Sequence, residues 1–111
     1  MIRITLFRQQ NRWAGFCAEG HAGYAEEGED IVCAAVSVLT TNTVNAIETL
    51  TEEDFTGEQR DGYLNFRLTD LPGDAAELLL QAMVLGLDSI QESYGDSYIQ
   101  IDTCLLYTSP S

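Results

Sequence analysis

The residues best suited to chemistry lie in one stretch, GHAGYAEEGEDIVCAAVS, which runs from Gly20 to Ser37. It holds the only histidine of the chain, His21, and a cysteine, Cys33, twelve residues later. A cysteine attacks as its thiolate, and an imidazole can accept the thiol proton and return a proton to a leaving group. The two residue types therefore suit a nucleophile and its base, but their spacing does not show that the side chains meet.

A predicted helix gives Cys33 a distinctive place. Apolar residues recur at the helical period over residues 31–50, and Asp30 precedes them as the predicted N-cap. Cys33 is then the third helical residue, where the positive end of the helix macrodipole favours a thiolate. On the helical wheel Asp30, Cys33 and Ser37 share a face beside the apolar stripe, so Asp30 and Ser37 are candidate supporting residues.

Each of these residues also has an ordinary structural explanation. Free cysteine is among the most buried residue types, so Cys33 is equally well explained as a small core residue. A loop histidine is often simply solvated, and Asp30 serves as a helix cap without orienting His21. Ser37 can bond back to its own helix. The residue types alone leave the catalytic and the structural explanations open.

A metal site is the main chemical alternative. A structural zinc site would combine Cys17, His21 and Cys33 with a fourth ligand from Cys104 or a carboxylate. The alternation of residues around Cys17 fits a strand better than a metal site. A peroxide-reactive thiol would need a resolving cysteine beside Cys33, and none is adjacent in the sequence. We therefore expect neither a metal ion nor an organic cofactor.

The other elements form a frame around this stretch. Residues 1–19 alternate as two strands around a polar turn, and residues 20–29 are rich in glycine and predict a loop. Two more strands flank Asp61-Gly62, which suits a tight hairpin turn. A second helix is predicted to start within residues 71–74 and to run to about Tyr94, and Tyr98, Ile99 and Ile101 predict a last short strand. We expect an α+β fold of two layers, an antiparallel sheet with two helices, in the order ββαββαβ.

The charge balance limits the partners. The chain has 18 acidic and 5 basic residues, and its net charge is -13. Because nucleic-acid affinity rests on Lys and Arg at the phosphates, we expect no direct nucleic-acid partner, whereas a basic peptide would be attracted. No signal peptide and no bilayer-spanning stretch is predicted, and three irregularly spaced cysteines fit reduced thiols. We expect a cytoplasmic protein with no membrane partner.

The length of 111 residues fits one domain. We predict that residues 1–103 form it, and that residues 104–111, CLLYTSPS, are a non-native or disordered tail. In the second helix, apolar residues from Leu78 to Leu87 spread around much of the circumference. One sheet face cannot cover them all, so we expect a homodimer, although a core helix enclosed on two sides is a comparable explanation.

The motifs resemble those of a known family. The stretch GHAGYAEEGEDIVCAAVSVLTTNTVNAI is similar to the histidine-to-cysteine signature of the bacterial ribosomal-processing cysteine proteases, the Prp family. The later GLDSIQESYGDSYIQI resembles the second helix and last strand of the same family. The resemblance extends over nearly the whole chain, to about Ile101.

The resemblance implies a small α+β homodimer that removes a short N-terminal extension from a large-subunit ribosomal protein. Cys33 matches the family nucleophile and His21 its base, while Asp30 and Ser37 match further motif positions. The glycine-rich loop matches a segment expected to order over bound peptide, with Gly20, Ala22, Gly23 and Tyr24 as its substrate-loop residues. The alternative is a non-catalytic acidic adaptor or assembly factor that binds a basic ribosomal protein and uses Cys33 only for packing.

Overall fold

The structure, a computed structural model, describes residues 1–20 and 27–107. The predictions for His21, Ala22, Gly23 and Tyr24 therefore lie outside the described residues. The elements in chain order are β1 (Ile2–Gln9), β2 (Arg12–Glu19), α1 (Glu27–Leu50), β3 (Phe55–Arg60), β4 (Tyr63–Leu68), α2 (Asp74–Tyr94) and β5 (Ile99–Leu105). The α+β class and the order ββαββαβ are confirmed.

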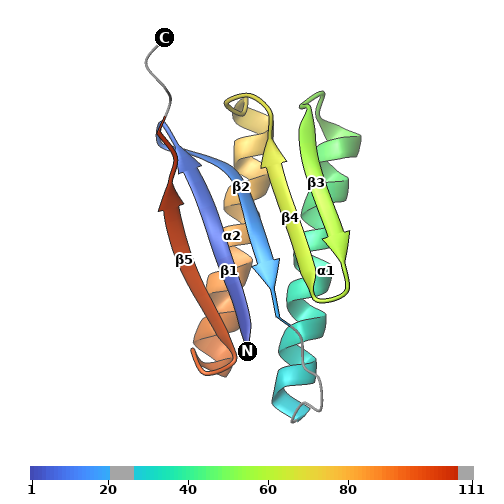
Figure 1. Ribbon diagram of the computed structural model, residues 1–111, viewed down its shortest axis with the longest axis vertical. Helices are drawn as coiled ribbons and strands as arrows, with labels where there is room; N and C mark the ends of the chain where they lie inside the picture. Colours follow the sequence, from blue (N-terminus) through green and yellow to red (C-terminus); the bar gives the residue numbers. More distant parts are fainter. Residues whose placement is uncertain (21–26, 108–111) are drawn as a thin grey trace.

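The sheet has five strands in the order β3-β4-β2-β1-β5, and both helices cover one of its faces (Figure 1). The neighbours β3 and β4, β4 and β2, and β2 and β1 are antiparallel. Strand β5 runs parallel to β1, with Ile2 opposite Ile99. The prediction of a wholly antiparallel sheet is wrong, because α2 carries the chain back along the sheet before β5 begins.

Strand β5 is also longer than predicted. It continues through Cys104 and Leu105, which lie opposite Phe7 and Arg8 of β1. The predicted domain end at residue 103 therefore falls inside a strand. The apolar residues that the two layers bury between them form one core, contributed by every strand except β3 and by both helices: Ile2, Ile4, Leu6, Phe16, Ala18, Val32, Val36, Ile47, Phe66, Leu68, Ala76, Leu80, Met83, Leu87 and Ile99.

Helix α1 begins earlier than the sequence predicts. It starts at Glu27, so Asp30 is its fourth residue and Cys33 its seventh, and Asp30 does not precede the helix as a cap. The loop prediction relied on the three glycines of residues 20–29, one of which is Gly28, because glycine is a poor helix former. The stretch Glu-Gly-Glu-Asp is nevertheless rich in acidic residues, which are favoured in the first turn of a helix.

One part of α1, Ile31–Leu50, has the length and the mean hydropathy, 1.3, of a membrane-crossing helix. The sequence prediction that no stretch reaches this length is wrong. Within the fold, however, Val32, Val36 and Ile47 of this helix are buried in the core. A core helix passes the same test of length and composition, so we describe α1 as part of the helical layer.

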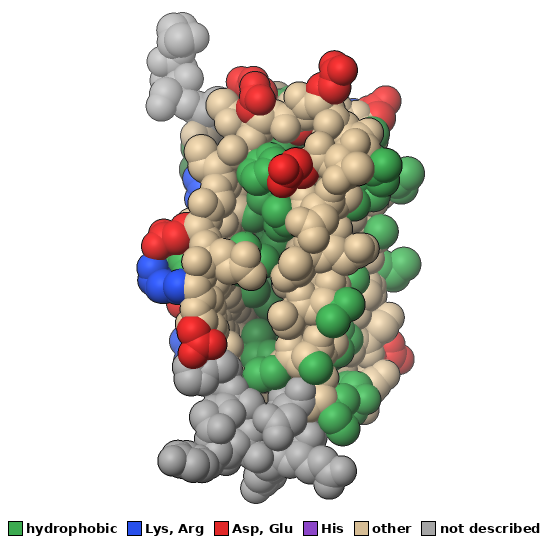
Figure 2. Space-filling model, turned by 90° about the vertical axis from the view of Figure 1, so that its right-hand side faces the viewer, with side chains coloured by type: hydrophobic (Ala, Val, Ile, Leu, Met, Phe, Trp, Pro, Cys, Tyr) green, Lys and Arg blue, Asp and Glu red, His purple; other side chains and the backbone are tan. Residues whose placement is uncertain are grey.

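A groove remains open between α1 and β3, the edge strand of the sheet. Helix α1 packs extensively on α2 and only sparsely on any one strand. Figure 2 looks into the resulting hollow, in which hydrophobic side chains form the floor between the sheet edge and the helix. The partly buried residues Val44, Phe55 and Leu64 pack against the core along this side of the molecule.

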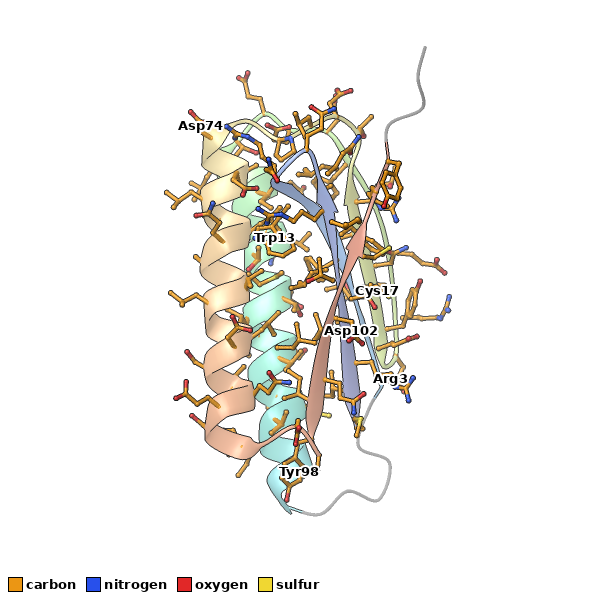
Figure 3. The ribbon with its side chains drawn as sticks, turned by 90° about the vertical axis from the view of Figure 1, so that its left-hand side faces the viewer. Arg3, Trp13, Cys17, Asp74, Tyr98 and Asp102 are labelled. Atoms are coloured by element: carbon orange, nitrogen blue, oxygen red, sulfur yellow. The ribbon has the colours of Figure 1, made fainter. Side chains whose placement is uncertain are left out.

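The other face of the sheet has no helix over it (Figure 3). Two arginines lie over aromatic rings there. Arg60 is 4.1 Å from the ring centroid of Tyr63 on the neighbouring strand, and Arg67 reaches across Gly15 of β2 to within 4.2 Å of the ring centroid of Phe7. A guanidinium over a ring is attracted by the negative face of the ring and also shields it from water. The open face is thus covered partly by arginine side chains.

Candidate active site

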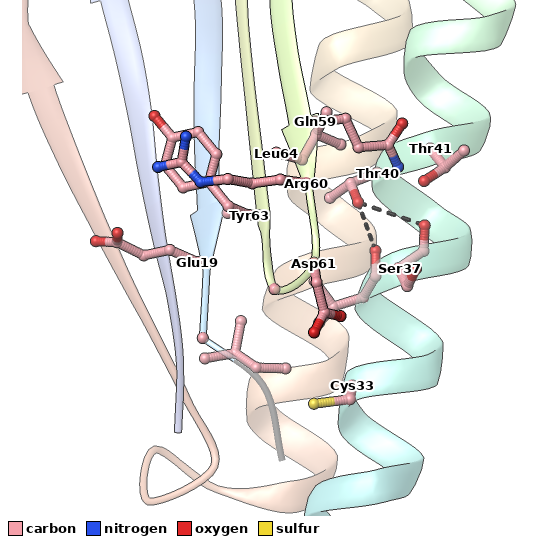
Figure 4. A pocket seen from close by; sticks show the side chains of 15 residues that line it. Glu19, Cys33, Ser37, Thr40, Thr41, Gln59, Arg60, Asp61, Tyr63 and Leu64 are labelled. Atoms are coloured by element: carbon pink, nitrogen blue, oxygen red, sulfur yellow. Dashed lines mark hydrogen bonds between the residues drawn. The ribbon is translucent and has the colours of Figure 1, made fainter. Parts of the chain in front are cut away.

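A pocket of about 230 Å³ lies at one end of the groove, where three segments meet. The end of β2 forms one wall, the face of α1 around Cys33 forms another, and the turn between β3 and β4 forms the third (Figure 4). Its lining residues include Gly20, Cys33, Ser37, Gln59 and Asp61. The fold therefore brings together residues that are far apart in the sequence, such as Gly20 and Asp61, which are 41 positions apart.

Cys33 points its sulfur into this pocket from α1 (Figure 4). Its side chain is half-buried, and one side of it packs against the core. Ser37 follows one helical turn later, is exposed, and lines the same pocket. The structure thus places a thiol and a hydroxyl on one face of a helix, next to an open pocket.

Gly20, the last described residue before His21, is held at the pocket wall. Gly20 donates its N–H to the carbonyl of Gly62, with an N···O distance of 2.9 Å. Its φ is +108°, and an added Cβ would lie 2.3 Å from the carbonyl oxygen of Met1, so only glycine fits here. His21 is the next residue in the chain and lies outside the described residues.

The position of Cys33 within α1 alters the predicted activation of its thiol. As the seventh helical residue, Cys33 lies beyond the first turn, where the effect of the macrodipole is concentrated. Its N–H is also beyond the first four donors of the helix, which alone lack a partner in the helix itself. The free end of α1 therefore does not act on Cys33 in the way that the sequence predicts.

The sequence did not predict that the β3–β4 turn forms the pocket wall opposite Cys33. Asp61, in the β3–β4 turn, directs its carboxylate toward the same space as the sulfur (Figure 4). Thr40 closes the pocket floor, since its hydroxyl donates to the carbonyl of Val36 at 2.8 Å and is almost fully buried. Asp61-Gly62 was predictable as a turn, but no local signal shows that the turn meets α1.

Cys17 lies in a different environment from Cys33. It faces the open side of the sheet, opposite Thr5 and Asn65, whereas Cys33 faces the groove on the helical side (Figure 3). The sheet separates the two thiols, which rules out the zinc site that would join them. Burial raises the pKa of the Cys17 thiol above 9.0, and the hydrogen bond with Tyr63 lowers it only partly.

Comparison with known proteins identifies the family. The sequence model of the family described as Cysteine protease Prp matches residues 1–100. The chain belongs to this family. The Prp family is a family of cysteine proteases, so the chain is an enzyme of that class.

Individual Prp proteins show how close the relationship is. The ribosomal processing cysteine protease Prp of Staphylococcus aureus is 40% identical over 81 residues, which are 71% of this chain and 76% of the relative. That of Bacillus subtilis is 33% identical over 104 residues, 87% of this chain and 93% of the relative. A crystal structure of the S. aureus protease with a covalently linked product peptide has a TM-score of 0.83 and 33% identity, covering 94% of this chain and 100% of that one.

Proposed function

We propose that the chain is an endopeptidase that removes a short N-terminal extension from a bacterial large-subunit ribosomal protein, with Cys33 as nucleophile and His21 as base. One observation carries the proposal: the Cys33 sulfur opens into a pocket whose wall includes Gly20, the residue directly before His21. The relatives are ribosomal processing proteases, and this supports the substrate class.

In the proposed reaction, the Cys33 sulfur attacks the scissile carbonyl after its proton has passed to His21. The imidazolium then protonates the leaving amine, and the neutral imidazole activates the water that releases the acyl group. Since Cys33 lies beyond the first turn of α1, His21 is needed to form the thiolate. Asp30, three residues before Cys33 in the same helix, is our candidate to orient the imidazole.

The developing oxyanion needs donors other than the Cys33 N–H, which belongs to the helix interior. The Ser37 hydroxyl lies one turn further along the same wall of the pocket and is our candidate for one of them. Gly20, Ala22, Gly23 and Tyr24 are proposed to form a loop over the bound peptide. No metal ion or organic cofactor is needed for these steps.

The charge of the site fits a basic substrate in the cytoplasm. Glu19 and Asp61 line the pocket together with one cation, Arg60, and the whole chain has a net charge of -13. A ribosomal protein is typically basic, so the field of the enzyme would speed its encounter with the substrate in a salt-dependent way. The same field opposes direct contact with nucleic acid.

Cleavage of a defined peptide tests the proposal. The probe is a synthetic peptide that spans the extended N-terminus of the ribosomal protein from the same genome, incubated under reducing conditions and followed by mass spectrometry. We expect cleavage at one bond by the wild-type protein and none by Cys33→Ser or His21→Ala. Cys17→Ser is the matched control, because it removes a thiol from the opposite face of the sheet and should leave cleavage intact.

An intact peptide with the wild-type protein would refute the assignment of the substrate. Cleavage by Cys33→Ser at the wild-type rate would refute the assignment of the nucleophile. The alternative function, a non-catalytic adaptor, predicts binding of the peptide without any cleavage. Membership of a protease family favours the enzyme.

We further propose that the enzyme is a homodimer joined through the outer face of its helices. No charged residue occurs from Ile31 to Ile47 or from Leu78 to Leu87, although the chain carries 23 charged residues in all. On this face Val38, Leu78 and Leu85 are each at least 66% exposed. Figure 2 shows such hydrophobic side chains projecting on the helical side. An uncharged face lets two strongly acidic copies meet without repulsion at the contact.

A further inference from the structure

The proposed catalytic steps do not involve the outer edge of β3. Strand β3 lies at one end of the sheet order, and among the described residues no strand pairs with its outer side. An edge strand presents free N–H and C=O groups to another chain, and proteins commonly block it with proline, lysine or a bulge. Strand β3, FTGEQR, has neither residue, and its register with β4 is unbroken.

The pairing with β4 determines which backbone groups point outward. Just before β3, Thr69 donates its N–H to the carbonyl of Asp54 at 2.9 Å. In an antiparallel pair, residues bonded to the partner alternate with residues whose N–H and C=O point away from it. The backbone groups of Phe55, Gly57 and Gln59 therefore point to the outer edge.

The side-chain positions of the same three residues lie on the groove side of β3. Phe55 packs on Phe66, with ring centroids 4.9 Å apart, and Gln59 lines the pocket. Gly57 stands between them without a side chain, and the nearest atom to an added Cβ would be the carbonyl oxygen of Asn65, at 3.4 Å. A gap therefore opens in the groove next to the free backbone groups.

The groove connects this edge to the nucleophile. Gln59 and Cys33 line the same pocket, and the hollow continues from the pocket along the sheet edge (Figure 2). At its far end the chain turns from α1 into β3 through residues 51–54, which include Glu52, Glu53 and Asp54. An extended peptide with basic side chains matches both the free edge and this acidic end.

We propose that the substrate peptide adds to the edge of β3 as a further strand, with its scissile bond at Cys33 and a basic segment toward residues 52–54. The proposal rests on the protease function and adds the way in which the substrate is held. Main-chain hydrogen bonds to Gly57 and Gln59 supply affinity, and the gap over Gly57 accepts one substrate side chain. The enzyme would then recognise the extended main chain of the substrate together with a small number of its side chains.

Filling the gap is the first test. Gly57→Val places a β-branched side chain in the groove at a position where the fold has room for it. We expect KM for the extension peptide to rise roughly tenfold or more, a loss of the order of one good contact, while the melting temperature is unchanged. The rate of Cys33 alkylation by iodoacetamide should also be unchanged. The matched control is Thr56→Val, on the opposite face of the same strand, which should retain the wild-type KM.

A second test examines the backbone directly. A series of substrate peptides, each with one N-methylated amide, is assayed with the wild-type enzyme. Strand addition predicts that methylation at every second residue next to the scissile bond raises KM and that the residues between tolerate it, because only alternate amides face β3. The alternation identifies a strand and would not result from a general loss of fit.

The outcomes separate this inference from the protease function. If the wild-type enzyme cleaves the peptide but Gly57→Val has an unchanged KM and the N-methyl series shows no alternation, strand addition is refuted and the protease function stands. If the wild-type enzyme cleaves no peptide, the protease function itself fails. In that case peptide binding to Cys33→Ala, measured by calorimetry, still tests the groove, and equal affinity for Cys33→Ala and Cys33→Ala/Gly57→Val would refute it.

Discussion

Replacing Glu77 should destabilise the fold far more than its place on a helix surface suggests. Glu77 lies in the first turn of α2 but is only 7% exposed. Its carboxylate accepts the backbone N–H of Trp13 at 2.6 Å and the side-chain amide of Gln81 at 3.0 Å. The Trp13 bond fastens the helix to the beginning of β2, at the end of the molecule where Asp74 also lies (Figure 3).

The magnitude follows from what Glu77→Ala leaves behind. The N–H of Trp13 loses a charged acceptor in a partly buried place, which typically costs about 1–3 kcal/mol. Taking about 2 kcal/mol, and about 4 °C per kcal/mol for a chain of 111 residues, the midpoint of thermal unfolding should fall by about 8 °C. Glu77→Gln keeps an oxygen acceptor and should lose clearly less.

Asp74 offers a matched control in the same helical turn. It accepts a hydrogen bond from Arg12 at 2.7 Å, but its side chain is 95% exposed. Exposed ion pairs contribute little, so Asp74→Ala should leave the midpoint close to that of the wild type. Thermal unfolding by circular dichroism measures all three variants. Equal losses for Glu77→Ala and Asp74→Ala would refute the argument, because burial would then not decide the strength of the bond.

Three further predictions concern other parts of the fold. Burial raises the pKa of the Cys17 thiol above 9.0. The free energy of unfolding should therefore fall as the pH rises from 9.0 through the raised pKa, because the unfolded chain loses the thiol proton more easily. In urea titrations Cys17→Ser should reduce this fall. Leu85→Glu should weaken the proposed dimer roughly a hundredfold in sedimentation equilibrium, since a symmetric interface loses one buried leucine from each copy. The control Gln100→Glu, on the open face of the sheet, should leave the dimer unchanged. Gly86→Val should lower thermal stability by about 1–3 kcal/mol, because an added Cβ lies 2.7 Å from Leu39 Cδ2, and Leu39→Ala should recover part of the loss.

Each of these three predictions would be refuted by a specific result. A wild-type pH slope in Cys17→Ser would show that the thiol does not contribute to it. An unchanged dimer with Leu85→Glu would place the interface elsewhere, and a monomeric wild type would remove the dimer itself. Additive losses in Gly86→Val and Leu39→Ala would show that the two positions are not coupled.

Local patterns predicted most of the elements. The alternation in β1 and β2 places the turn where Gln10 and Asn11 adopt positive φ angles of 49° and 65°, as two-residue hairpins require. Gly95 ends α2 with a φ of 99°, a conformation that glycine adopts without strain. These features depend on residues that are close in sequence, so the sequence shows them directly.

Long-range relations were not accessible in the same way. The direction of β5 depends on which edge of the sheet remains free when α2 has packed, and no residue of β5 encodes it. Glu77 has the charge of a surface residue, yet it is buried where its carboxylate accepts the N–H of Trp13 in β2. The pocket joins α1 to the turn at Asp61, and the contact between them exists only in the folded chain. Of the site, the sequence singled out Cys33 as a candidate, but it predicted neither its distance from the helix start nor the walls around it.

The parallel pairing of β1 with β5 affects how the protein can be made. Strand β1 begins at Ile2 and pairs with β5, which ends at Leu105. The ribosome releases residues in chain order, so nearly all of the chain must emerge before β1 has both of its neighbours. Until then one edge of an apolar strand stays open to wrong partners. An enzyme proposed to act on newly made ribosomal proteins would thus complete its own sheet only near the end of its own translation.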